Sequence, residues 1–433
     1  MGLLETALLL LFLLCLLLGA GLWISLALAG TGWVAMSLVH PQPGLFLASA
    51  YWESSGSWTL AALPMFIWMG EILFRTRLSE ELFNGLSPWV RRLPGRLLHV
   101  NILACGLFGS VSGSSAATCA TVSKIALPEL RRRGYSERVA IGSLATAGTL
   151  GIMIPPSIIM VVYAVAAEVS IIRVFIAGMI PGLIVMALFS LYIALWALLN
   201  PSRQPQADPP LRLREKLRQS AQLIPCVLLI VAVIGSMFVG WATATEAAAF
   251  GVFGSLILAA ATGSLSVRSF LDSLAGATRL SCMILFILAG AAFLTKAMAL
   301  TGIPAALASA VTEAGLGPYA IIAILTVVYL ILGTALDGVS MIVLTTSVVV
   351  PMVQQAGFDL VWFGIFIILL VEIAEISPPL GFNLFVMQTM TGKEQTEIAL
   401  AALPFFAMLV ATVVLITLFP GIVTFLPDLV LGR

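Results

Sequence analysis

Residues 148–157 read Gly-Thr-Leu-Gly-Ile-Met-Ile-Pro-Pro-Ser, and residues 374–381 read Ala-Glu-Ile-Ser-Pro-Pro-Leu-Gly. Each Pro-Pro pair lies inside a long apolar segment and follows an earlier proline, Pro128 or Pro351, by 27 residues. The two patterns are 223 residues apart. A proline removes a backbone donor and clashes with the preceding helical turn. Each apolar segment is therefore expected to form two half-helices joined by an unwound stretch.

A second pair of stretches corresponds upstream of each joint. Residues 112–115 (Ser-Gly-Ser-Ser) match residues 337–340 (Asp-Gly-Val-Ser) once a two-residue difference in length is allowed. They interrupt segments 97–128 and 318–352, which are too long for one span and too broken for two. Such segments are typical of re-entrant helical hairpins, whose tips must be buried in protein or line a wet cavity. Paired breaks in two halves predict a secondary transporter with its binding site at the breaks.

The composition excludes a soluble domain. Hydrophobic residues make up 61% of the chain and charged residues 9%, whereas a soluble domain carries about a quarter charged residues. The net charge of +1 and the absence of a basic patch argue against a nucleic-acid partner. We predict an all-α polytopic membrane protein in a lipid bilayer. Its expected full spans lie near residues 3–30 (read as a span, not a cleaved signal), 58–74, 139–166, 174–199, 221–240, 243–263, 280–300, 360–390 and 397–427.

The basic residues predict that the two halves are inverted relative to each other. Stretches 301–317 and 353–359, which flank the second hairpin, contain no Lys or Arg, and neither does stretch 40–57, expected outside as a loop. By the positive-inside rule the first hairpin opens to the cytoplasm and the second to the opposite side, as the five spans between them require. The stretches flanking the first hairpin are basic through Arg75, Arg77, Arg91, Arg92, Arg96, Arg131, Arg132, Arg133 and Arg138.

The predicted spans and hairpins also divide the chain into a scaffold and a transport core. Segments 79–96 and 264–279 mix apolar and charged residues, which fits either in-plane interfacial arms or ordinary short connections. The basic, proline-rich loop 200–220 is the natural linker between the halves. The expected units are 1–96 (scaffold spans and first arm), 97–166 (first hairpin and broken helix), 167–317 (scaffold spans, linker and second arm), 318–390 (second hairpin and broken helix) and 391–433 (C-terminal span).

The first hairpin tip has the composition of a small ion site. Residues 109–118 are glycines, alanines and small hydroxylated residues, with one valine, so backbone groups are accessible there. Carbonyl and hydroxyl oxygens suit a small monovalent cation, and amides at half-helix N-termini suit an anion. The alternative is a small-residue face for helix packing, which the matched tip in the other half disfavours.

Several polar residues lie deep in apolar sequence. Asp337 is a functional candidate because an intramembrane carboxylate is expensive; we favour a cation ligand over a structural acceptor. Of Glu372 and Glu375, one is expected to face the cavity and the other to pair across helices. Asn383, past the second break, is able to bond a substrate oxygen. Lys296 either reaches an anionic substrate or snorkels to the interface.

With these residues in view, the chain resembles the large membrane (M) subunit of the tripartite ATP-independent periplasmic (TRAP) transporters. The resemblance covers nearly the whole chain and is most specific in residues 109–129, 148–157 and 376–385. It implies a sodium-driven importer of an organic anion, a carboxylate or sulfonate, in a bacterial inner membrane. It also implies two partners, a small membrane Q subunit, here expected as a separate polypeptide, and a periplasmic substrate-binding protein. Glu375 occupies a position that is often uncharged in that family.

The resemblance also implies residue roles. Na⁺ is the expected coupling ion, with no organic cofactor. The expected sodium-binding residues are Ser110, Ser112, Gly113, Ser114, Gly148, Thr149, Gly333, Thr334, Asp337, Gly338, Ser377 and Pro378. The expected substrate-binding residues are Ser115, Thr118, Pro155, Pro156, Lys296 and Asn383.

An elevator mechanism is expected, in which hairpins and broken helices carry cations and substrate past the scaffold. Sodium binding would order the tips and create the anion site, which couples the two ligands. The first alternative is a stand-alone sodium/anion symporter that needs no binding protein. A membrane-embedded enzyme is the second; no nucleophile motif with an Asp–His pair supports it.

Overall fold

The structure is a computed structural model that describes residues 2–76, 78–205, 211–313, 315, 317–334, 336–379 and 381–432; the side chains of residues 78–80, 222, 308 and 310–313 lie outside that description. The described residues form twenty-two α-helices, three short 3-10 helices and no strand. Five helices are long and apolar enough to cross a membrane, and three bent helix pairs pass the same test together. The predicted all-helical, multi-spanning fold is therefore confirmed.

The N-terminal region differs from the prediction at two places. The span expected over residues 3–30 is wrong, because the chain breaks at Gly21, which adopts a left-handed backbone with φ +78°. The outer loop expected at 40–57 is also wrong, because most of it is a helix that meets the next span at a 53° bend. The elements here are α1 (Leu3–Gly19), α2 (Ile24–Val39), α3 (Pro43–Ser55), η1 (Trp58–Ala61) and α4 (Ala62–Phe74).

The first hairpin and the first broken helix form where the sequence predicts them. The hairpin turns at Gly113, whose left-handed backbone (φ 59°) ends one arm, and Ser114 caps the other. The broken helix bends by 44° ahead of Ile158. The elements are α5 (Leu78–Val90), α6 (Leu98–Ser112), α7 (Ser115–Arg132), α8 (Glu137–Ala147), α9 (Leu150–Met153), α10 (Ile158–Ala166) and α11 (Ile171–Leu199).

The middle of the chain supplies further spans. The segment 264–279 is neither a separate arm nor a connection, because from Val267 onward it continues into the following span as one 35-residue helix. Its charged residues lie on exposed turns and so do not interrupt the helix. The elements are η2 (Pro201–Arg203), α12 (Leu213–Ser220), η3 (Ala221–Leu223), α13 (Ile224–Phe238), α14 (Ala244–Ala261), α15 (Val267–Thr301) and α16 (Ile303–Glu313).

The second pair of arms and its broken helix follow the same order as the first, although these two arms make few backbone contacts with each other and meet through the hydroxyls of Tyr329 and Thr345. The hairpin turns between Gly333 and Asp337, and the broken helix is interrupted at the second Pro-Pro pair; both Pro-Pro bonds are cis. The last expected span, 397–427, is itself divided before Gly421. The elements are α17 (Pro318–Leu332), α18 (Gly338–Gln355), α19 (Leu360–Glu375), α20 (Phe382–Thr391), α21 (Gln395–Leu418) and α22 (Gly421–Leu431).

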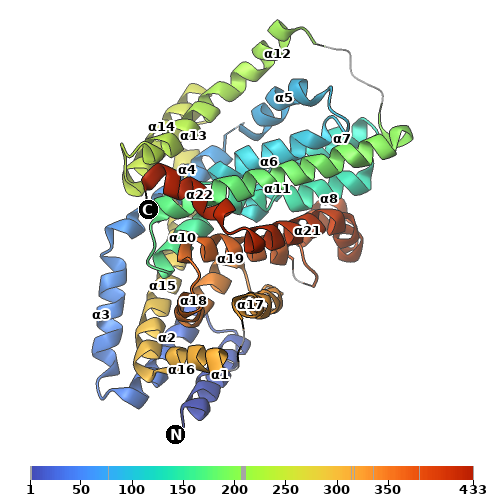
Figure 1. Cartoon of the computed structure of the whole chain (residues 1–433). Helices are drawn as coiled ribbons and strands as arrows, with labels where there is room; N and C mark the ends of the chain where they lie inside the picture. The colour runs from blue at the N-terminus through green and yellow to red at the C-terminus, as the bar shows by residue number, and fades with distance from the viewer. Residues whose placement is uncertain are drawn as a thin grey trace.

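The two halves pack reciprocally around the centre. The second hairpin arm of each half, α7 or α18, lies on the second half-helix of the other half, α20 or α10. The first arms, α6 and α17, pack on broken helices of their own half, α9 and α19. Figure 1 shows α6 beside α7 and α11 in the upper part of the view, with α16–α18 in the lower part. Because each half packs a hairpin arm on a half-helix of the other half, both tips and both breaks lie in the middle of the molecule.

Segments predicted for the same membrane side meet in space. Lys393, which follows the second broken helix, lies 3.9 Å from Glu137, which follows the first hairpin. Lys393 also bonds to Glu397, whose carboxylate raises the pKa of the lysine. Arg96 donates to the carbonyl of Pro205 in the linker. The hydroxyl of Tyr163 donates to the Leu360 carbonyl at 2.5 Å on the side predicted to be outer. Arg77, one of the basic residues that flank the first hairpin, lies outside the described structure.

Candidate functional site

Both hairpin tips and both helix breaks line one cavity of about 550 Å³. Apolar side chains of helix α15 line the remaining side of the cavity. Of the described residues around this cavity, none is Lys or Arg, and two carry carboxylates. The wall is formed by Gly113, Ser114, Ser115 and Ala116 (first tip), Ile152, Ile158 and Ile159 (first break), Asp337, Gly338 and Val339 (second tip), Glu375 and Phe382 (second break), and Leu280, Met283 and Ile284.

The first tip is held by a compact network of hydroxyl groups. The hydroxyls of Ser112 and Thr118 lie 2.7 Å apart, and Thr118 also donates to the Ser114 carbonyl at 2.7 Å. The Ser114 hydroxyl caps α7 by accepting from the Ala117 amide. The tip therefore gathers several oxygen atoms within one turn. Ser110 lies behind it, buried and bonded to a carbonyl of its own helix.

Each hairpin packs against the break of its own half through glycine. A Cβ on Gly109 would lie 2.4 Å from the Cα of Gly151. A Cβ on Gly333 would lie 2.2 Å from the Cβ of Ala374. Neither separation is possible for real atoms, so only glycine allows the backbones to come this close. The contact places Gly151 against the Thr118 hydroxyl and the Ser114 carbonyl.

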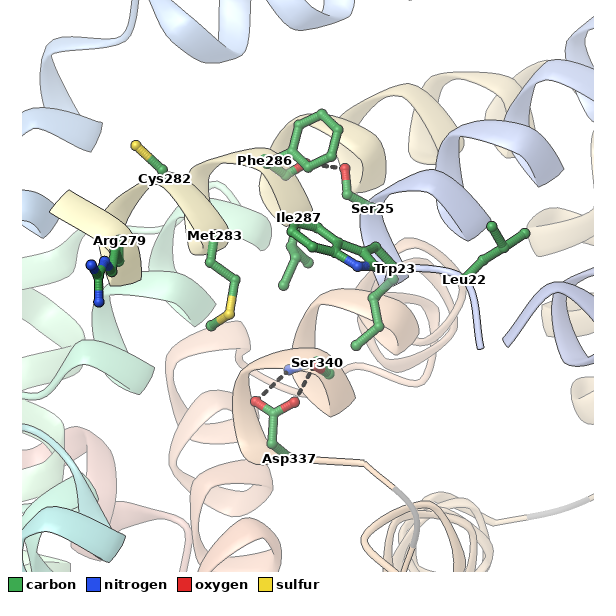
Figure 2. A pocket seen from close by; sticks show the side chains of 11 residues that line it. Leu22, Trp23, Ser25, Arg279, Cys282, Met283, Phe286, Ile287, Asp337 and Ser340 are labelled. Atoms are coloured by element: carbon green, nitrogen blue, oxygen red, sulfur yellow. Dashed lines mark hydrogen bonds between the residues drawn. The ribbon is translucent and has the colours of Figure 1, made fainter. Parts of the chain in front are cut away.

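Asp337 lies at the second tip and faces two adjoining cavities. Its carboxylate caps α18 by accepting from the amide and the hydroxyl of Ser340. The side chain also lines both the central cavity and a larger one of about 820 Å³. Figure 2 shows Asp337 and Ser340 across this space from Trp23 and Met283. Asp337 thus has the structural role that the sequence left open and a position for contact with a ligand.

A much smaller pocket lies between the second tip and the second break. Its volume is about 10 Å³, which is close to the space that one water-sized ligand needs. Asp337 and Glu375 both line it, together with Gly333, Gly338 and Ala374. Three of the predicted sodium-binding residues therefore surround a space of ionic size.

Asn383 joins the halves and is fully buried. Its amide donates to the Ser115 hydroxyl and to the Ala145 carbonyl, both at 2.8 Å. A Cβ on Gly148 would lie 3.1 Å from the same amide nitrogen. These contacts place the predicted substrate residues Asn383 and Ser115, and the predicted sodium residue Gly148, in one cluster.

The remaining predicted site residues are less central. Lys296 lies outside the cavities and forms an ion pair of 2.5 Å with Glu53. Pro155 and Pro156 are buried, whereas Pro378 is exposed. Each of three further hydroxyls donates to a carbonyl near the end of the preceding helix: Thr149 to Thr146, Thr334 to Ile331 and Ser377 to Ile373.

Two features were not predicted as site residues. Arg279 and Trp23 line the larger cavity, and Figure 2 shows Arg279 at its edge beside Cys282. Arg279 comes from the segment expected to be an arm, and Trp23 from the middle of an expected span. The carboxylates of Glu372 and Glu375 were recognised as intramembrane groups but were not assigned to a site. Glu375 lines the central cavity, as expected for one of the two, and Glu372 lies beside Thr149 of the first broken helix.

Comparisons with known proteins agree on one family. Residues 9–422 match the family described as "Tripartite ATP-independent periplasmic transporter, DctM component". The C4-dicarboxylate TRAP transporter large permease protein of Pseudomonas aeruginosa is 33% identical, over 93% of this chain and 94% of that protein. The ectoine/5-hydroxyectoine large permease of Ruegeria pomeroyi is 31% identical over 87% of each chain. The isethionate permease protein DctMQ of Oleidesulfovibrio alaskensis is 29% identical over 92% of this chain and 63% of that protein.

The fold also has a solved counterpart. The YdaH transporter of Alcanivorax borkumensis superposes with a TM-score of 0.62 at 14% identity, over 92% of this chain and 97% of that one. At this identity the likeness concerns the fold alone. The relatives are transporter permeases and not enzymes, so the enzyme alternative is excluded.

Proposed function

Because the chain belongs to the family of DctM components of tripartite ATP-independent periplasmic transporters, we propose that it is the large membrane subunit of a sodium-driven importer in a bacterial inner membrane. The cargo is an organic anion, a carboxylate or a sulfonate. A periplasmic binding protein delivers it, and a small Q subunit braces the membrane part. The relatives carry the names of a dicarboxylate, ectoine and isethionate, so their names do not select one substrate for this chain.

The central cavity is the observation that carries the proposal. Two hairpin tips and two helix breaks from different halves of the chain meet around about 550 Å³. That volume lies in the range typical of small-molecule sites. Unwound backbone at the breaks and helix N-termini at the tips supply the donors that an anionic group needs. In this arrangement α7 and α18 direct their N-termini, at Ser114 and Asp337, towards the cavity.

The residues fit a small hard cation. Around the first tip the available groups are hydroxyls and carbonyls of Ser112, Ser114 and Thr118, and around the second tip they include the Asp337 carboxylate. Oxygen ligands are those that hard cations prefer. We expect Na⁺ bound there to supply the positive charge that the cavity wall lacks, so that anion affinity depends on Na⁺.

The packing supports an elevator division. The hairpins and broken helices, α6–α10 and α17–α20, form the group that would move. The scaffold contains α2, α4, α14 and α15, which pack extensively on one another. These scaffold helices meet the moving group where α15 contacts α18 and where α4 contacts α6, and α11 and α21 also pack on the moving group. Substrate and Na⁺ would cross with the moving group.

Uptake with and without a binding protein tests delivery. The purified membrane complex, with its Q subunit, is reconstituted into liposomes, and a neighbouring binding protein loaded with its ligand is added outside. We expect uptake only when the binding protein is present. Equal uptake of free substrate would overturn this part of the proposal and establish the stand-alone symporter. Binding-protein ligands also identify the substrate directly.

A further inference from the structure

Glu372 is a buried carboxylate without a partner. It lies on α19 at 0% exposure, and neither of its carboxylate oxygens has a hydrogen-bond donor in bonding geometry among the described residues. The Thr149 hydroxyl lies beside it but donates to the Thr146 carbonyl. One turn further along the same helix, the Oε2 atom of Glu375 is also buried and unpartnered. Buried polar atoms in proteins are nearly always bonded, so three such oxygens on adjacent turns require an explanation.

The neighbours of the pair do not neutralise it. Glu372 lies beside Thr149 of the first break and beside Glu375. Glu375 in turn lies beside Ser115 and Asp337. The charged groups that act on the two glutamates are thus other carboxylates. Buried like charges repel strongly, and an isolated buried charge is costly, so either a proton or a bound cation must neutralise them.

The glutamate pair places a carboxylate at the first break, whose own hairpin tip contains none. The second tip contains Asp337, whereas residues 112–115 of the first tip offer only hydroxyl and backbone oxygens. Helix α19 belongs to the second half but packs on α9 at the first break, where Glu372 meets Thr149. Each break is therefore approached by a carboxylate, Glu372 at the first and Asp337 at the second.

We propose that Glu372 and Glu375 bind a monovalent cation, with Thr149 supplying a hydroxyl oxygen from the opposite broken helix. The site deepens the proposed sodium coupling and rests on it. The unpartnered oxygens of the two glutamates become ligands, and the cation removes the repulsion between them. Glu375 also lines the small pocket at the second tip together with Asp337.

Thermal unfolding of the detergent-purified protein tests the site without measuring transport. The midpoint is followed against NaCl, with choline chloride holding the ionic strength constant. A ligand bound only by the folded state raises stability with the logarithm of its concentration, and the slope counts the ions bound. We expect Glu372→Gln to lower the slope by one ion, and Glu375→Gln to raise the half-saturating Na⁺ concentration about 10- to 100-fold.

Glu397→Gln, an exposed glutamate paired with Lys393, serves as the control and should follow the wild type. If Glu372→Gln fails to fold, direct binding of radioactive Na⁺ to wild type and Glu375→Gln gives the same answer through affinity. If the wild type responds to Na⁺ and both variants respond as the wild type does, this site is overturned but sodium coupling stays intact. A wild type without any Na⁺ response would instead overturn the proposed function. If the wild type shows the infrared band of a protonated carboxyl group, and Glu372→Gln loses that band but keeps its Na⁺ response, then the glutamate pair binds a proton. That result would overturn the proposed cation site.

Discussion

The amide of Asn383 donates to the hydroxyl of Ser115 at 2.8 Å, across 268 residues of sequence. One residue follows the second helix break and the other begins the second arm of the first hairpin. The same amide donates to the Ala145 carbonyl on the first broken helix. One buried side chain therefore ties the tip of one half to the breaks of both.

Asn383→Ala should destabilise the centre of the protein. The change leaves the Ala145 carbonyl and the Ser115 hydroxyl without this donor, and an unpaired buried group costs about 1–3 kcal/mol. We expect a lower unfolding midpoint in detergent and a loss of uptake. Thr389→Ala, on the exposed side of the same helix, is the matched control. A midpoint and an uptake rate equal to wild type would show that the bond does not join the halves.

Asp337→Asn should separate the charge of the second tip from its capping role. Asparagine still accepts a hydrogen bond at the start of α18, so the helix should remain intact. We expect the half-saturating Na⁺ concentration for uptake to rise about tenfold or more, which corresponds to about 1.4 kcal/mol of binding free energy. Ser340→Ala removes the donor and keeps the carboxylate, so its Na⁺ dependence should change less. Unchanged Na⁺ dependence in Asp337→Asn would make Asp337 purely structural.

Gly109→Ala should force the first hairpin away from the first break. The new Cβ would meet the Cα of Gly151 at 2.4 Å and its nitrogen at 2.8 Å, both rigid backbone atoms. Overpacking of this kind costs about 1–3 kcal/mol. We expect a lower midpoint and impaired uptake. Gly235→Ala, which has open space around it, provides the comparison and should not lower the midpoint. Equal behaviour of the two variants would remove the argument for close backbone approach.

The order of the helices was predictable from residues that act locally. The Pro-Pro pairs marked both helix breaks and Gly113 marked the first tip, because proline interrupts a helix and glycine adopts the left-handed backbone that ends one. The break at Gly21 was missed because the apolar run around it contains no proline. The long α15 was missed because its charged residues suggested a connection, although they are exposed on a continuous helix. The meeting of Glu372 with Thr149 depends on packing between the halves, which no local pattern specifies.

Cysteine labelling in intact cells should place the flanks of the two hairpins on opposite sides of the membrane. Arg132, with 74% of its side chain exposed, lies after the first hairpin, and Gly317, with open space around it, precedes the second. The exposed Cys15 and Cys282 are first replaced by serine. We expect Arg132→Cys to react only with reagents that reach the cytoplasm, and Gly317→Cys with impermeant reagents outside. Labelling of both from one side would contradict the inverted repeat.

The most direct test of the account is the driving force for uptake. The membrane complex is reconstituted into liposomes with the loaded binding protein outside, and uptake is measured under an inward Na⁺ gradient or, in Na⁺-free buffer, under an inward proton gradient of equal size. The hydroxyl, carbonyl and carboxylate oxygens at the tips predict accumulation with the Na⁺ gradient and none with protons alone. Equal accumulation under the proton gradient without Na⁺ would contradict the account.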